Sequence, residues 1–188
     1  MSAALRLRLL ILAIVILSRF VQTAHAEGAT YSEASVKAAF VYNFFKFIEL
    51  SGAPSKDVRL CVFASPEKRE ALRAVDGKAL EAGLLRVREL RAQAPEEDCA
   101  SCDAIFVEAS DKKGSLEILS LATRRKILTI GEGPAFIQAG GAIRLYIDQG
   151  KIRFEVNLGQ AEAAGAKISS KLLKLGRVVN PNENVGSP

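Results

Sequence analysis

Apolar runs of strand length alternate with stretches of helical character along this chain. Three such runs lie at 58–64, 103–108 and 126–130, and predicted helices at 67–75 and 114–123 separate them. Strands joined by helices are typical of parallel sheets, because the crossover between parallel strands is usually a helix. The pattern predicts an α/β fold: a single three-layer domain with a mostly parallel sheet and helices on both of its faces.

The sheet is predicted to end in an antiparallel hairpin. Residues 142–147 and 151–157 have strand character, and Asp148-Gln149-Gly150 between them is typical of a turn. Residues 84–90 alternate between apolar and charged side chains, which predicts an exposed or edge strand. The acidic stretch at 95–98 is expected to be a loop.

Further helices are predicted at both ends of the domain. The first covers 32–50, with Ser32 as its N-cap. Its expected apolar face, at helical spacing, consists of Val36, Phe40, Phe44, Phe47 and Ile48, widened by Val41 and Phe45. A short helix is expected after the 131–134 turn and should end at the glycine pair 140–141. A last helical region covers 158–178, with a possible break at Gly165.

The last helical region carries two stripes of different chemistry. The basic stripe consists of Lys167, Lys171, Lys174 and Arg177, and the apolar stripe of Ile168, Leu172, Leu175 and Val179. Cations near a helix C-terminus are favoured by the helix dipole, so a solvated face is the main interpretation. Loose attraction to anionic lipid headgroups is the alternative.

The N-terminus has the features of a secretory signal peptide. Basic residues at 6 and 8 precede an apolar run at 9–17, and the small-residue site Ala24-His25-Ala26 follows. The apolar run is too short to span a bilayer, which takes about 20 residues. We therefore expect a cleaved signal peptide over 1–26, one domain over 27–179 and a disordered tail over 180–188, with no stable membrane insertion.

Removal of this leader changes the charge balance. The chain has 26 Lys and Arg against 21 Asp and Glu, and residues 1–26 contain three arginines and no acidic residue. The count becomes 23 against 21, so the net charge falls from +5 to +2. No nucleic-acid partner is expected, because such partners are bound by strongly basic surfaces.

Catalysis is not expected from the processed chain. His25 is the only histidine, and it lies inside the leader. Without imidazole, Ser-His-Asp and Cys-His catalysis and His-containing metal sites are excluded. We predict no catalytic residue, no metal and no cofactor. A hydrolase is disfavoured because no nucleophile–base pair is evident.

Three cysteines, Cys61, Cys99 and Cys102, permit one disulfide in an oxidising compartment. Cys61 in the first strand could reach Cys102 or Cys99 beside the next buried strand. Cys61–Cys102 is the favoured pairing, and Cys99–Cys102 remains open. The Cys99-x-x-Cys102 spacing is a poor redox or metal motif, because it lies among acidic residues and lacks further ligands.

Two other features of the sequence are candidate sites. The glycines at 131, 133, 140 and 141 follow a strand, but Phe136 occupies the third position of a dinucleotide fingerprint, so turn and cap glycines are the main interpretation. Glu155 lies on the strand face opposite Phe154 and Val156, where a solvated carboxylate is expected. On an exposed sheet face it could also be a recognition residue.

Seven segments, in order along the chain, resemble one known family. They are Val36–Phe47, Leu60–Phe63, Cys102–Val107, Leu128–Gly131, Gly140–Ile143, Arg153–Leu158 and Ile168–Leu173. Together they are similar to the YfiR family of bacterial periplasmic proteins, over about residues 33–178. Some members carry a second disulfide, for which this chain lacks the cysteines.

The resemblance implies a periplasmic regulator, not an enzyme. The best-understood family type binds the periplasmic sensor region of an inner-membrane diguanylate cyclase and represses it, which lowers cyclic di-GMP signalling and biofilm formation. It also implies a possible homodimer, a bridge between Cys61 and Cys102, and a partner-binding role for Glu155. The first helix and the hairpin face around Glu155 are the expected contact surfaces.

A periplasmic small-ligand-binding module is the alternative function. In α/β sheets, ligands bind at the carboxyl ends of strands. Those ends are expected near Ser65, Ser110 and Gly131–Pro134.

Overall fold

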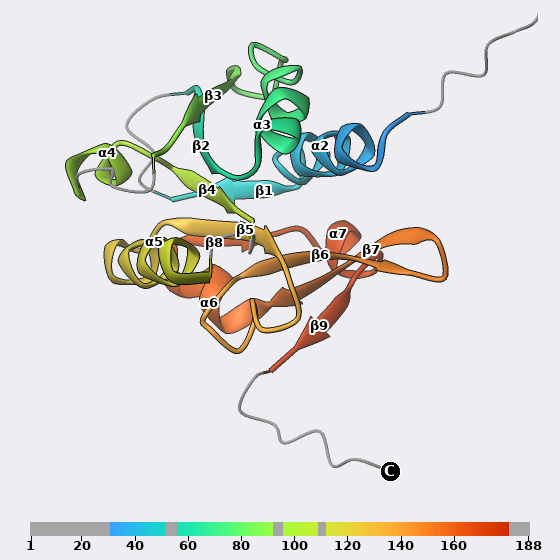
Figure 1. The fold of residues 1–188 in the computed structure, drawn as a ribbon. Helices are drawn as coiled ribbons and strands as arrows, with labels where there is room; N and C mark the ends of the chain where they lie inside the picture. Colours follow the sequence, from blue (N-terminus) through green and yellow to red (C-terminus); the bar gives the residue numbers. More distant parts are fainter. Residues whose placement is uncertain (1–30, 52–55, 92–95, 109–111, 181–188) are drawn as a thin grey trace, which may run out of the picture. The chain divides into compact units, whose positions relative to one another are not determined.

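The computed structural model describes residues 31–51, 56–91, 96–108 and 112–180, which form a mixed α/β domain (Figure 1). Its strands are β1 (Ile48–Leu50), β2 (Val58–Phe63), β3 (Leu85–Glu89), β4 (Ala104–Val107), β5 (Leu128–Glu132), β6 (Ile143–Asp148), β7 (Lys151–Asn157), β8 (Ala166–Ile168) and β9 (Arg177–Val179). Its helices are α2 (Glu33–Phe44), α3 (Pro66–Arg73), α4 (Glu96–Ala100), α5 (Lys112–Arg125), α6 (Leu158–Ala163) and α7 (Ser170–Leu173).

Seven of these strands form one sheet in the order β3-β2-β4-β5-β6-β7-β9. The strands from β3 to β6 pair in parallel, β6 and β7 form the antiparallel hairpin, and β9 pairs in parallel with β7 at the edge. β1 and β8 form a separate antiparallel pair. The predicted fold class, the hairpin and the edge position of β3 are therefore confirmed.

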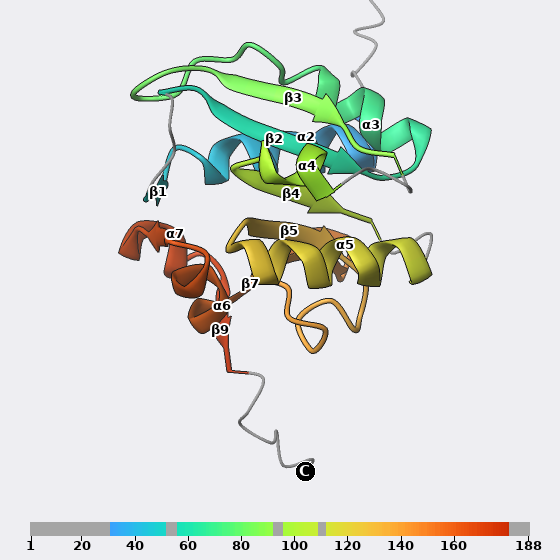
Figure 2. The ribbon, with the colours of Figure 1, turned by 90° about the vertical axis from the view of Figure 1, so that its left-hand side faces the viewer.

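Side-chain alternation along the central strands produces two cores. Leu60 and Phe106 point to one face, where they pack with α2 and α3 residues such as Val41 and Leu72. Cys61 and Ile105 point to the other face, which α4 and α5 cover, and Figure 2 shows these two helices in front of β4 and β5. Burial of both sheet faces requires strands that are apolar throughout, as the all-buried pattern of β4 shows.

The first helix is shorter than predicted. Ser32 is its N-cap, and its hydroxyl accepts from the backbone N–H of Ser35 at 3.2 Å. The helix ends at Phe44, and the chain then enters β1, which pairs with β8. The prediction of a helix to residue 50 is therefore wrong, and Phe47 lies outside the helix. The buried α2 residues are Ala34, Lys37, Ala38, Val41 and Phe44.

Three further local predictions are wrong. The acidic stretch around residue 96 is the start of helix α4 rather than a loop, and residues 134–140 are a series of turns rather than a short helix. In these turns Phe136 packs onto Gly131 and Gly141, where an added Cβ would lie 2.3 and 2.2 Å from its ring. These two glycines therefore serve close packing.

The last helical region is also not one helix. It breaks at Gly165, whose φ is +72°, into α6, β8, α7 and β9. The basic and apolar stripes predicted for this region therefore do not share a helix. Among the described residues no helix is long and apolar enough to cross a membrane. The predicted leader and residues 181–188 of the predicted tail lie outside the described residues.

Candidate functional site

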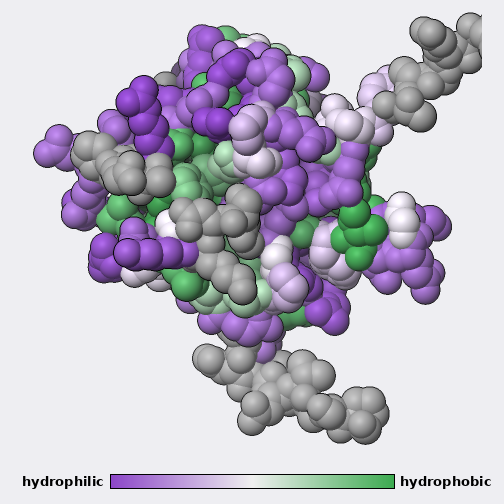
Figure 3. Space-filling model, in the orientation of Figure 1, coloured by the Kyte–Doolittle hydropathy of each residue, from purple (hydrophilic) through white to green (hydrophobic). Residues whose placement is uncertain are grey.

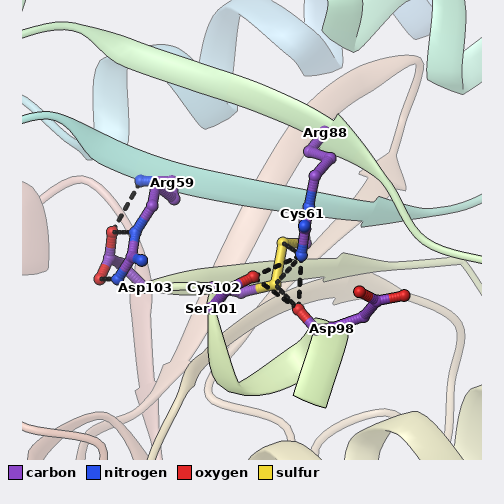
Figure 4. The surroundings of a disulfide bond; sticks show 7 residues. All are labelled: Arg59, Cys61, Arg88, Asp98, Ser101, Cys102 and Asp103. Carbon is purple, nitrogen blue, oxygen red and sulfur yellow. Dashed lines mark hydrogen bonds and ion pairs between the residues drawn. A yellow bond between two sulfur atoms is a disulfide. The ribbon is translucent and has the colours of Figure 1, made fainter. Parts of the chain in front are cut away.

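The disulfide joins Cys61 in β2 to Cys102, which lies just before β4 (Figure 4). Because β2 and β4 are neighbouring parallel strands, the two Cα atoms are 5.8 Å apart. The favoured pairing is confirmed. The bond closes a loop with a sequence separation of 41, which stabilises the fold by about 2–4 kcal/mol in the chain-entropy account.

Arg88 of β3 extends over the disulfide, as Figure 4 shows. Its Nη2 lies 3.9 Å from the Sγ atoms of both bonded cysteines and donates to the Asp98 carbonyl and the Ser101 hydroxyl. Cys99 in α4 is a free, fully buried thiol. Burial, followed by the charge of Asp98, raises the pKa of Cys99, so this thiol is held in its unreactive form.

Glu155 is buried, so the expectation of a solvated carboxylate is wrong. The residue is only 3% exposed, because two arginines on the neighbouring strands cover it. Arg144 Nε of β6 lies 2.6 Å from Oε1, and Arg177 Nη2 of β9 lies 2.6 Å from Oε2. The hydrogen bond to Glu155 raises the pKa of Arg177. Both carboxylate oxygens are thus occupied, and the role of Glu155 in partner binding stays a prediction.

The hairpin and the edge strand β9 expose large apolar side chains. Ile147, Leu175 and Val178 are 48%, 72% and 45% exposed. Figure 3 shows an apolar patch at the base of the β6–β7 hairpin, beside a mostly hydrophilic surface. We call the β6–β7 hairpin, β9 and the α7–β9 turn the hairpin edge. Exposed apolar groups next to arginines are typical of protein-binding surfaces.

The first helix packs directly under the hairpin edge. The rings of Phe44 in α2 and Phe154 in β7 lie 4.9 Å apart in an edge-on arrangement. Gly176 also lies against the Phe154 ring: a Cβ added to Gly176 would lie 2.2 Å from a ring carbon. The two expected contact surfaces, the first helix and the hairpin, therefore pack against each other through the buried Phe154 ring.

A second ionic cluster lies at the carboxyl ends of β4 and β5. Glu132 Oε2 accepts from Lys37 of α2 at 2.8 Å and from Lys68 of α3 at 2.9 Å. Lys68 also donates to Glu108 at 2.6 Å, and Lys37 contacts Glu33 at 2.5 Å. Glu132 Oε1 is buried and accepts no hydrogen bond from the described residues.

Glu108 lies beside the N-terminus of α3. Its Oε2 accepts from the backbone N–H of Ser65, the N-cap of α3, at 2.6 Å. Burial opposes the Glu108 charge, but hydrogen bonds from Lys68 and Ser65 outweigh it and lower the pKa of Glu108. The space left at this end of the sheet is a cavity of about 420 Å³ between α5 and the 133–139 turns, with a mainly apolar wall.

Several residues of these clusters were not predicted from the sequence. They are Lys37, Lys68, Glu108, Glu132 and Arg144. Arg177 was predicted to lie in a basic stripe, but its contact with Glu155 was not predicted. A lysine among the apolar residues of the first helix was the available signal, because a buried cation requires a partner. Within the described part of the chain no three His, Cys, Asp or Glu side chains are grouped to hold a metal ion.

Comparisons with known proteins give both a family and a fold. A model of the YfiR/HmsC-like family matches residues 34–177. No curated protein matches the chain. A conserved domain protein from Vibrio cholerae is similar in structure, with a TM-score of 0.53 and 13% identity. The ABC domain from Streptococcus pneumoniae, solved in complex with L-Trp, is similar with a TM-score of 0.54 and 17% identity.

These structural similarities concern the fold alone. In both cases 78% of this chain aligns with 60% of the solved chain, so this chain spans about 60% of the length of those proteins. Both neighbours are α/β domains, in agreement with the sheet described above.

Proposed function

Because the chain belongs to the YfiR/HmsC-like family, we propose that it is a periplasmic regulator that binds and represses the periplasmic sensor region of an inner-membrane diguanylate cyclase. Repression would lower cyclic di-GMP and limit biofilm formation. The observation that carries this proposal is the extent of the match, which runs from α2 to the first residue of β9. The protein would act by binding, not by catalysis.

Repression by binding requires differential affinity. A regulator shifts its partner only if it binds the inactive conformation more tightly than the active one, and a nearly complete shift takes about 5.5 kcal/mol of preference. The hairpin edge suits this task, since exposed apolar side chains there adjoin a cationic pair. The Phe44–Phe154 contact packs β7 of this edge against α2.

The test is association of the exported protein with the periplasmic sensor region of an inner-membrane diguanylate cyclase from the same organism. Leu175→Glu places a charge on the hairpin edge and should weaken association at least tenfold and raise cellular cyclic di-GMP. Leu116→Glu on α5 is the control, because Leu116 is also exposed and apolar and lies at the cavity between α5 and the 133–139 turns rather than on the hairpin edge. Absence of association in the unsubstituted protein would overturn the proposal. Equal effects of both substitutions would move the contact surface away from the hairpin edge.

The second candidate is a small-ligand-binding module. The apolar cavity between α5 and the 133–139 turns supports it, because small-molecule sites are concave and mainly apolar. Leu119 lies in its wall, and Leu119→Trp would fill part of the space. A metabolite that raises the unfolding midpoint of the native protein but not of this variant would favour this candidate.

A further inference from the structure

A second cavity, separate from the hairpin edge, lies beside the small β1–β8 sheet. This cleft has a volume of about 720 Å³. Large apolar side chains from β1, β2 and the loops next to them line its floor: Phe45, Phe47, Ile48, Leu50, Val58 and Leu80. Phe47 is the most exposed of them, at 36%. Phe47, Leu50, Val58 and Leu80 are partly exposed and form an apolar strip at the surface of the cleft, whereas Phe45 and Ile48 are buried beneath it.

Backbone contacts hold the walls of this cleft in place. The N–H of Ser169 donates to the Phe47 carbonyl at 2.9 Å, which fixes the β8–α7 connection against β1. The Tyr42 hydroxyl donates to the Ala79 carbonyl at 2.7 Å and ties α2 to the loop that forms the opposite wall. Gly83 lies so close to the Lys56 backbone that an added Cβ would be 2.2 Å from its carbonyl oxygen. The cleft is thus preformed.

Lysines dominate the rim of the cleft. Lys46, Lys56, Lys167 and Lys171 line it, against Glu49 and Glu81, so the lining charges sum to +2. Lys167 lies 3.7 Å from Glu49, but both side chains are about 80% exposed, where such a pair is weak. Lys46 rests over the Tyr42 ring at 4.4 Å. Lys56 and Lys171 form no ion pair with a described residue, so their charges remain available.

We propose that this cleft binds an anionic amphiphile: one acyl chain on the apolar floor, with its carboxylate or phosphate head among the lysines. The apolar strip supplies affinity that grows with chain length, and the lysines select the sign of the head group. Neither feature alone gives this preference, because a bare anion gains nothing from the floor and a cationic surfactant is repelled by the rim. The site is independent of the hairpin edge and of the proposed partner.

The test compares surfactants of equal chain and opposite charge, all below their critical micelle concentrations. Dodecanoate should bind the full domain one to one by calorimetry, at least tenfold more tightly than dodecyltrimethylammonium. Affinity should rise about tenfold for each two carbons from octanoate to dodecanoate, since each buried methylene contributes about 0.8 kcal/mol. Added salt should weaken binding of dodecanoate.

Two variants locate the site. Lys56→Gln with Lys171→Gln should weaken dodecanoate binding about tenfold. The charge-matched control, Lys151→Gln with Lys174→Gln, alters lysines that do not line the cleft and should leave dodecanoate binding unchanged. Phe47→Ser, at a partly exposed position, should weaken binding of the longer chains more than binding of octanoate.

Several outcomes would overturn the proposal. These are equal binding of both surfactants, no one-to-one binding of dodecanoate, and equal losses in the two lysine pairs. A separate experiment measures binding of the protein to vesicles of phosphatidylglycerol. If they bind the protein while dodecanoate does not, the lysines act at a membrane surface and the cleft is not an acyl-chain site. Association with the cyclase segment in the same samples reports on the proposed function separately.

Discussion

Two carboxylates, the buried Glu155 and the partly buried Glu132, hold different parts of this molecule by different means. Glu155 binds one arginine on each oxygen, Arg144 on Oε1 and Arg177 on Oε2. Glu132 binds both Lys37 and Lys68 through Oε2 and leaves Oε1 without a donor from the described residues. Both carboxylate oxygens of Glu155 therefore have a cationic partner, whereas one oxygen of Glu132 has none among the described residues.

The cations differ in what else they contact. Lys37 and Lys68 each have a second carboxylate, Glu33 and Glu108 respectively, so each keeps a partner if Glu132 is lost. Among the described residues, Arg144 contacts the Gly133 carbonyl at 3.5 Å and the Tyr146 ring at 4.8 Å in addition to Glu155, and neither of these carries a counter-charge. The hairpin edge therefore depends on one carboxylate, while the carboxyl ends of β4 and β5 are held by a network with redundancy.

The largest effect is expected at Glu155. Glu155→Gln leaves the half-buried Arg144 without a counter-charge, and removal of one member of a buried pair costs several kcal/mol. Because Arg177 can turn to solvent, we expect a loss of about 2–4 kcal/mol in the free energy of unfolding, measured with urea at pH 7. Glu49→Gln is the control, since Glu49 is 82% exposed, and it should cost less than about 0.5 kcal/mol.

Glu132→Gln should cost less, about 1–2 kcal/mol by the same measurement, because both lysines keep a carboxylate and the amide oxygen can still accept one hydrogen bond. If Glu132→Gln were instead more destabilising than Glu155→Gln, the second carboxylate partners of Lys37 and Lys68 would not explain the difference in stability between the two clusters.

Much of the fold could be predicted from the sequence, because local patterns decide it. The buried strands β2 and β4 and the β6–β7 hairpin follow from apolar runs and a turn, and the Cys61–Cys102 bridge follows from parallel neighbours. These features are determined by interactions between residues that are close along the chain or in adjacent strands.

The errors arise where distant segments decide. Residues 45–50 continue the apolar pattern of α2, but residues 45–47 form a turn, and pairing with β8, more than 100 residues later, makes residues 48–50 a strand. Gly165 breaks the last helical region for the same reason, since β8 must turn back to meet β1. Glu155 was expected to be solvated because its alternation with Phe154 says nothing of the arginines on β6 and β9.

The lysine network should determine part of the pH dependence of stability. Burial opposes the Lys68 charge, but hydrogen bonds to Glu108 and Glu132 outweigh it and raise the pKa of Lys68 above its ordinary 10.5. The pKa of Glu108 lies below its ordinary 4.5. A lowered carboxyl pKa gives stability that is present above about pH 4.5 and lost as the pH falls through the folded value.

A raised lysine pKa gives stability that is present below about pH 10.5 and lost as the pH rises through the folded value. Glu108→Gln should therefore cost about 1 kcal/mol at pH 7 and flatten the decline in unfolding free energy below pH 4.5. Urea unfolding at pH 7, 5.5 and 4 measures both. An unchanged acid decline in the variant would assign that decline to other carboxylates.

The smallest effect on stability is expected from Arg177→Gln. Arg177 is 66% exposed, and its loss leaves Glu155 paired with Arg144, so the free energy of unfolding should fall by less than about 1 kcal/mol. Arg144→Gln, at a residue only 16% exposed, should cost more. The same two variants separate structure from recognition. If the exposed guanidinium contacts the cyclase segment, Arg177→Gln weakens association more than Arg144→Gln while destabilising the fold less. If instead both losses of association follow the losses of stability, Glu155 and its arginines only maintain the hairpin edge, and its apolar side chains alone carry the contact.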